Sequence, residues 1–368
     1  MTRRLDRTQA LLAGALAVLG VMTVYSAHAD WNRQILWVLL GAAAYVAATV
    51  YDYRRLSSIA PTLYGAMLLM LVAVHLAGHS ALGARRWLSV AGFPLEPSEI
   101  SKLILVLVLA AYLARHEQIS WRVFGGGLAL LVPPAYLVLA QPDLGTTMVI
   151  AAVTLGMLYL GGARPAQLLA VVAACAVALP LLPRLLHGYQ RRRLEIFLDP
   201  NQDPLGAGYN LLQARIAVGS GGMFGRGWLQ GLQGQLGFVP ERATDFVFAT
   251  FAEEFGLLGS LVLLTAFGVL LIRVLRAASV APDRFGELLA GGAFVMVFVQ
   301  VIQNVGMNIG LMPIAGIPLP LISYGGSATI TTLAALGLVQ SVVVRRRPVV
   351  HPESERRGLG TISRRAQA

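Results

Sequence analysis

One carboxylate, Asp245, stands where a long polar stretch of the chain enters an apolar run, in the sequence RATDFVFA. Partly apolar surroundings raise the pKa of a carboxylate, and a general base needs such surroundings to take a proton from a hydroxyl group near neutral pH. Capping of the following helix is the alternative role. Glu253 and Glu254 follow inside the apolar run, and because carboxylates are costly in lipid we expect both to face protein or a polar cavity.

Further charged or hydroxyl-bearing residues stand at the starts of other apolar runs. Glu99 and Lys102 are three apart, so on a helix they can pair, which makes their burial tolerable. Lys102 is the single lysine of the chain, and a structural ion pair and a functional pair both stay open. Asp143 follows a proline in QPDLGT, where helix capping is the default role. Ser323 lies in ISYGGS, whose glycines and hydroxyls at a helix start can expose backbone N–H groups to an anion.

Guanidinium groups are the third candidate set, because they bind phosphate oxygens bidentately. Arg85, Arg86 and the adjacent Trp87 lie in one polar segment, and Arg226 and Arg242 lie in another. These arginines predict a surface for a phosphorylated, membrane-embedded substrate. Contact with lipid phosphates, or solvation alone, is the competing interpretation.

Composition shows what kind of molecule must position these groups. Hydrophobic residues make up 56% of the 368 residues and charged residues only 13%, so polar groups cannot cover a soluble globule and the outer surface must face lipid. The formal net charge of +11 fits arginine-rich cytoplasmic loops better than nucleic-acid binding. A single cysteine, Cys175, excludes an intramolecular disulfide framework and a cysteine-based metal cluster.

Ten transmembrane helices are expected from the long uncharged runs. They cover residues 8–27, 34–51, 59–77, 98–114, 123–140, 144–161, 165–183 and 246–272, and two lie within 288–344. Three prolines within 312–320 forbid one continuous helix across that last interval.

Arginine placement predicts the orientation. With both termini in the cytoplasm, most loop arginines lie inside, as the positive-inside rule requires. We therefore expect an all-α, multi-pass membrane protein with one membrane domain, residues 1–347, and a disordered cytoplasmic tail, residues 348–368. The large loop 184–245, between the seventh and eighth helices, then lies outside. A loop of that length is typically functional, so the active face is predicted to be extracytoplasmic.

Five motifs occur in a fixed order along residues 8–345. They are ARRW (84–87), EPSE with its following lysine (96–102), QPDLGT (141–146), TDF followed by EEFG (244–256) and PLISYGGS (320–327). In this order, and with ten spans, the chain resembles the SEDS family (shape, elongation, division and sporulation) of bacterial cell-wall synthesis. Its short N-terminal tail and compact length are more similar to the rod-shape member than to the division member.

This resemblance implies a peptidoglycan glycosyltransferase that polymerises lipid II at the outer face of the bacterial cytoplasmic (inner) membrane, for cell elongation and rod shape. A class B penicillin-binding transpeptidase is the implied partner. The family's essential aspartate falls on Asp245, and its other functionally sensitive positions fall on Arg86, Trp87, Glu99, Lys102, Asp143 and Ser323.

Asp245 would then act as general base, and Arg85, Arg86, Arg226 and Arg242 would steady the departing lipid pyrophosphate. No cofactor is expected and no dedicated carboxylate cage for a metal is evident, while a divalent cation bridging the pyrophosphate stays open. Two rival functions remain: a lipid II flippase, with Glu99, Lys102, Glu253 and Glu254 along the transit path, and a scaffold that recruits wall enzymes.

Overall fold

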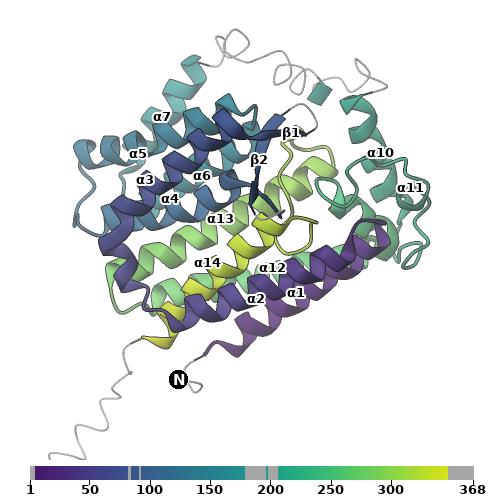
Figure 1. The fold of residues 1–368 in the computed structure, drawn as a ribbon, viewed down its shortest axis with the longest axis horizontal. Coiled ribbons are helices and arrows are strands. Elements are labelled where there is room, and N and C mark those ends of the chain that lie inside the picture. The colour runs from purple at the N-terminus through teal and green to yellow at the C-terminus, as the bar shows by residue number, and fades with distance from the viewer. Residues whose placement is uncertain (1–4, 82–83, 91–92, 179–195, 198–205, 347–368) are drawn as a thin grey trace, which may run out of the picture.

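The chain folds into a mostly helical bundle, seen in the computed structural model of Figure 1. The structure describes residues 5–81, 84–90, 93–178, 196–197 and 206–346. Its main helices are α1 (Arg7–Ser26), α2 (Trp31–Val50), α3 (Arg54–Ala77), α4 (Pro97–Leu113), α5 (Trp121–Ala140), α6 (Leu144–Leu160), α7 (Pro165–Ala178), α12 (Val247–Ser279), α13 (Arg284–Asn308) and α14 (Gly326–Val344). Helix α13 runs between the group α3 to α7 and the group α1, α2 and α12 (Figure 1).

A helix covers each of the ten ranges in which a span was expected, although α7 is described only as far as residue 178. Seven of them (α1, α2, α3, α5, α12, α13 and α14) are long and apolar enough to cross a membrane, and α6 and α7 are shorter apolar helices. Helix α4 has 17 residues and is mostly buried inside the bundle. The membrane class is confirmed, and ten crossings stay a prediction.

The expected all-α class needs one correction. A small antiparallel sheet in the order β1-β2-β3 lies between α3 and α4, built from β1 (His79–Ala81), β2 (Ala84–Val90) and β3 (Phe93–Leu95). In the second pairing Leu88 faces Leu95 and Val90 faces Phe93. Strand β2 carries the ARRWLSV segment, which lacks the strict apolar–polar alternation that identifies a half-buried strand from sequence.

Helix α12 is broken at Gly256, where φ is 67° and ψ is −166°. The break frees the carbonyls of Glu253 and Glu254, which accept hydrogen bonds from the N–H groups of Arg226 (2.9 Å) and Gly227 (3.0 Å). Beyond the break, Leu257 N–H donates to the carbonyl of Gly222 at 2.9 Å. Segment 222–227 therefore supplies hydrogen-bond partners for the backbone groups that the break leaves without helical partners, as an interrupted membrane helix requires.

The described part of the large loop is anchored by two buried carboxylates of α12. Glu253 accepts from the N–H groups of Gln233 (2.8 Å) and Gly234 (3.0 Å), at the start of the one-turn helix α11 (Leu232–Gln235). Glu254 accepts from Leu229 N–H (3.1 Å) and from the hydroxyl of Ser26. The expectation that both carboxylates face protein is confirmed, because each is at most 2% exposed.

Helix α10 (Ala207–Ser220) is the other ordered piece of this loop. It packs on α12 and α13, and Figure 1 shows α10 and α11 together at one end of the bundle. Leu211, Ala214 and Ala217 are buried in a small apolar cluster that also contains Phe246 and Met307. Residues 184–195, 198–205 and the predicted tail 348–368 lie outside the described residues.

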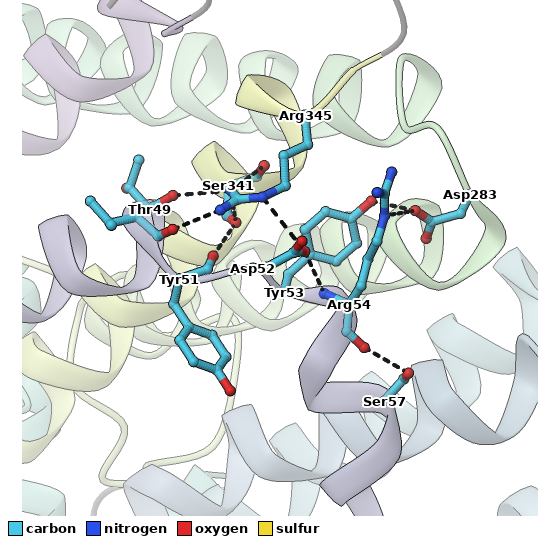
Figure 2. A network of polar contacts seen from close by, with 10 residues as sticks. Thr49, Tyr51, Asp52, Tyr53, Arg54, Ser57, Asp283, Ser341 and Arg345 are labelled. Carbon is cyan, nitrogen blue, oxygen red and sulfur yellow. Dashed lines mark hydrogen bonds and ion pairs between the residues drawn. The ribbon is translucent and has the colours of Figure 1, made fainter. Parts of the chain in front are cut away.

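A polar network closes the opposite end of the bundle (Figure 2). Asp283 caps α13 and accepts from the hydroxyl of Tyr53 (2.5 Å) and from Nε of Arg54 (3.0 Å). Arg345 donates to the carbonyls of Thr49 (3.2 Å) and Val50 (2.6 Å). The α2–α3 connection is therefore tied to the start of α13 and the end of α14.

Gly256→Ala tests the break in α12. We expect it to lower the free energy of unfolding by at least about 2 kcal/mol, because the backbone region is nearly restricted to glycine. A Cβ there would also lie 2.3 Å from the nitrogen of Gly225. Thermal unfolding of the detergent-purified protein measures the effect.

Gly268→Ala is the matched control in the same helix, since a Cβ at that position meets nothing within 4 Å. It should be neutral or stabilising by up to about 1 kcal/mol. Equal unfolding midpoints for the two variants would show that the break does not need glycine.

Candidate active site

Asp245 lies in the turn that leads into α12, which begins at Val247 with Phe246 as its N-cap residue. The turn is closed by hydrogen bonds from the N–H groups of Thr244 and Phe246 to the carbonyl of Glu241, both 3.1 Å. Asp245 is half-buried. Its backbone is therefore fixed at the end of the bundle that carries α10 and α11.

Two buried asparagines of α13 hold the Asp245 peptide. Asn304 Nδ2 donates to the carbonyls of Asp245 (2.9 Å) and Ile317 (2.8 Å). Asn308 Nδ2 also donates to the Asp245 carbonyl (3.1 Å), while its Oδ1 accepts from Ala249 N–H (3.0 Å). Sequence reasoning missed both residues. Their signal was available: two amides one helical turn apart in an uncharged run.

Ser323 lies beside the same turn. Its hydroxyl donates to the carbonyl of Thr244 (2.6 Å) and accepts from Leu319 N–H (2.8 Å). Tyr324 N–H adds a bond of 2.7 Å to the carbonyl of Ala243. The predicted residue Ser323 is thus brought next to Asp245, where its contacts brace the turn.

Four other predicted residues come together in a second cluster. Arg86 donates to the carbonyl of Pro142 (2.7 Å), and its Nη1 lies 3.8 Å from Oδ2 of Asp143. Asp143 caps α6 by accepting from Thr146 N–H at 3.0 Å, so the capping role expected for it is confirmed. Lys102 and Glu99 form an ion pair of 2.6 Å between side chains that are almost fully buried.

The loop between α13 and α14 contacts both clusters. Its Ile317 carbonyl is bound by Asn304, and a Cβ on Gly145, two residues after Asp143, would lie 2.1 Å from the carbonyl of Ala315. At the start of α14, Ser327 Oγ accepts from Glu96 N–H at 2.9 Å. Asp245 and the charged cluster of α4 and α6 therefore share one supporting loop.

The remaining predicted arginines have separate places. Arg242 is half-buried, and its guanidinium donates to the carbonyls of Ala27 (2.8 Å) and Gly234, which ties the loop to the end of α1. Arg226 is exposed, and its Nε donates to the carbonyl of Ser220 at 2.9 Å. Trp87 is half-buried in β2 opposite His79. Arg85 belongs to the same strand, and its side chain lies outside the described residues.

Glu96 is a further acidic group of the charged cluster, at the N-cap position of α4. Burial, followed by the nearby carboxylates of Glu99 and Asp143, raises its pKa to about 8, against the smaller opposing effects of Arg86 and Lys102. The hydroxyl of Ser98 donates to Glu96 Oε1 at 3.1 Å. The cluster thus contains a carboxyl group that is neutral near pH 7.

This pKa predicts how stability depends on pH. The ordinary carboxyl value is 4.5 and the folded value is about 8. The stability that neutral Glu96 contributes is therefore fully present below pH 4.5 and is lost as the pH rises through about 8. Glu96→Gln should remove this loss, so its unfolding midpoint should fall less steeply than that of the wild type between about pH 5 and 9.

Glu287→Gln is the matched control for that titration, because the Glu287 side chain is 44% exposed and pairs with Arg284 at the other end of the bundle. Its pH profile should parallel the wild type. Parallel profiles for the wild type and Glu96→Gln would contradict the raised pKa.

Comparison with known proteins places this geometry in a family. The family model of the FtsW, RodA and SpoVE cell cycle proteins matches residues 8–348. The peptidoglycan glycosyltransferase MrdB of Escherichia coli (strain K12) is 41% identical, over 93% of this chain and 94% of MrdB. The peptidoglycan glycosyltransferase RodA of Treponema pallidum is 30% identical, over 90% of this chain and 96% of that protein.

Solved structures agree. A chain from a study of polymerization and crosslinking by a peptidoglycan synthase complex superposes with a TM-score of 0.83 and 34% identity, covering 94% of this chain and 99% of that one. The rod shape-determining protein RodA of Thermus thermophilus gives a TM-score of 0.71 and 32% identity, with coverage of 93% and 97%. The chain therefore belongs to the FtsW, RodA and SpoVE family of cell cycle proteins, which is the SEDS family that its motifs predicted.

Proposed function

We propose that this chain is a peptidoglycan glycosyltransferase that polymerises lipid II at the outer face of the bacterial inner membrane, with Asp245 as its general base. Its relatives carry the name of this activity. The observation that carries the assignment of the base is the Asp245 peptide, which is held by Asn304 and Asn308 at the start of α12. Such fixed placement of a half-buried carboxylate is what proton abstraction requires.

In the proposed reaction, the 4-hydroxyl of the acceptor N-acetylglucosamine attacks C1 of the donor sugar. Asp245 accepts the hydroxyl proton as the new C–O bond forms. The bond from C1 to the lipid pyrophosphate breaks, and the pyrophosphate leaves with the electron pair. A single displacement of this kind inverts an α-linked donor into a β-linked product.

Arg86 and Lys102 are the cations best placed to accompany the pyrophosphate, because both belong to the charged cluster that shares a supporting loop with Asp245. Arg242 has a different role in this proposal: its guanidinium holds the large loop on α1. Arg85 and Arg226 remain proposed contacts of the substrate. A divalent cation bound with the pyrophosphate would add to the stabilisation of its charge.

The proposed orientation puts both termini in the cytoplasm and Asp245 outside. Ser26, at the end of α1, contacts Glu254 just inside α12, whereas Leu5 and Arg346 line one pocket at the other end of the bundle. These contacts support a membrane-spanning arrangement in which Asp245 lies on the side opposite to Leu5 and Arg346. For the partner we propose a class B penicillin-binding transpeptidase; the similar solved chain comes from a complex that coordinates polymerization and crosslinking.

The flippase alternative is less well supported by the contacts. Glu253 and Glu254 use their carboxylates to bind backbone N–H groups of the loop. These charges stabilise protein segments, whereas a transit path needs groups that exchange partners with a moving substrate. A cell-elongation role, as distinct from division, stays a proposal based on the MrdB and RodA relatives.

Asp245→Asn is the direct test of the base. With lipid II, the transpeptidase partner and no other polymerase, we expect the purified variant to make glycan strands at least about 100-fold more slowly than the wild type, because general-base catalysis contributes roughly 10²–10⁴-fold. Strand length and amount are read on gels. Asp245→Glu should recover part of the rate.

Asp30→Asn is the matched control, because Asp30 is an exposed carboxylate that caps α2, and asparagine caps helices equally well. It should keep the wild-type rate. Full activity in Asp245→Asn would exclude Asp245 as the base. No strand from the wild type, together with movement of labelled lipid II between leaflets of sealed vesicles, would favour the flippase.

A further inference from the structure

A cationic pocket lies at the end of the bundle opposite Asp245. It has a volume of about 250 Å³ and is lined by Arg7, Arg273, Arg276 and Arg346, with Asp6 as its acidic residue. These arginines come from three places: the first turn of α1, the C-terminal part of α12 and the segment just after α14. Nothing in the proposed glycosyl transfer uses this pocket.

The charge of the pocket is not neutralised by its own acidic group. Asp6 caps α1 by accepting from Gln9 N–H (3.1 Å) and binds Arg273 through Nε and Nη2, both at 2.7 Å. This pair fixes α1 against α12 and holds one guanidinium in the wall. Arg7 and Arg276 are exposed at the opening, so the lining carries four positive charges against one negative charge. Guanidinium groups in this arrangement favour a phosphate.

Apolar side chains continue from the pocket along the bundle surface. Leu11 lies one helical turn after Arg7 and is 73% exposed, and Ile272 lies one turn before Arg276 and is 64% exposed. Residues four apart share one face of a helix, so an exposed apolar side chain lies next to each arginine at the opening of the pocket. A ligand that fits both parts has an anionic head and a hydrocarbon chain, which distinguishes a lipid from free phosphate.

We propose that this pocket binds the phosphate headgroup of an anionic phospholipid, with an acyl chain lying along α1 and α12. Arginines spread over a membrane-facing surface only attract anionic lipids in general, and each near the surface adds roughly fivefold in affinity. Four of them around one cavity define a site. The bound lipid bridges α1, α12 and the segment just after α14, at the end of the bundle where Leu5 and Arg346 lie.

Native mass spectrometry of the full chain in detergent tests this site. The probes are dioleoylphosphatidylglycerol and dioleoylphosphatidylcholine. We expect the first phosphatidylglycerol to bind the wild type roughly tenfold or more tightly than phosphatidylcholine, and R7Q with R276Q to reduce that preference to within about twofold. Arg273 is left in place because its pair with Asp6 joins α1 to α12.

R115Q with R122Q is the matched control, because it removes the same charge from exposed arginines of the same end, beyond α4 and at the start of α5. It should keep the preference, as should R7K with R276K, which retains both charges. The site is excluded if the wild type shows no preference, if the control loses it equally, or if the lysine variant loses it as fully as the glutamine variant. In a competition measurement, phosphatidylglycerol should displace inorganic phosphate from the pocket. If phosphate stays bound in the presence of phosphatidylglycerol, a lipid is excluded as the occupant.

Discussion

Irregular backbone that is buried in a membrane protein must find partners for its N–H and C=O groups within the protein, and this constraint governs the half of the molecule around Asp245. Three irregular segments meet there: the break at Gly256, the stretch 222–234 and the α13–α14 loop. Backbone N–H groups of Arg226 and Gly227 support the break, and buried polar side chains support the other two segments. Glu253 and Glu254 bind the N–H groups of the stretch 229–234, and Asn304 binds the carbonyl of Ile317.

The candidate base is held by the same arrangement. The carbonyl of Asp245 is the shared acceptor of two asparagines that also bind Ile317 and Ala249. Because buried amides with several partners have one low-energy geometry, the turn at Asp245 and the neighbouring loop adopt a fixed relative position. The side chains that bind the buried backbone groups therefore also fix the position of Asp245. Their loss would disturb the loop packing and the site together.

In the charged cluster of α4 and α6, the buried groups likewise depend on partners within the protein, because its carboxylates and cations are buried together. Glu99 pairs with Lys102, and Arg86 lies near Asp143. Glu96 stays neutral near pH 7 because burial, followed by the carboxylates of Glu99 and Asp143, raises its pKa to about 8. The far end of the bundle has the opposite character. There Asp283 and Arg345 tie the helix ends together (Figure 2). The arginines of the pocket at this end keep an excess of positive charge over Asp6. The described part of the protein thus has its candidate base and charged cluster at one end of the helices and an arginine-lined pocket at the other.

The sequence by itself determined the membrane class, the helix positions and the family, because long apolar runs and ordered motifs are local signals. It also predicted Asp245, Arg86, Glu99, Lys102, Asp143 and Ser323 as candidate site residues, and it predicted that Glu253 and Glu254 face protein. Only the tertiary structure showed that Asn304 and Asn308 bind the carbonyl of Asp245 and that the Arg242 guanidinium donates to two backbone carbonyls. It also showed that Arg86 lies in a three-stranded sheet. The bonds of Asn304 and Asn308 to Asp245 and of Arg242 to Ala27 join residues 59 to 215 positions apart, and a hydrogen bond between distant segments leaves no spacing in the sequence from which it could be derived.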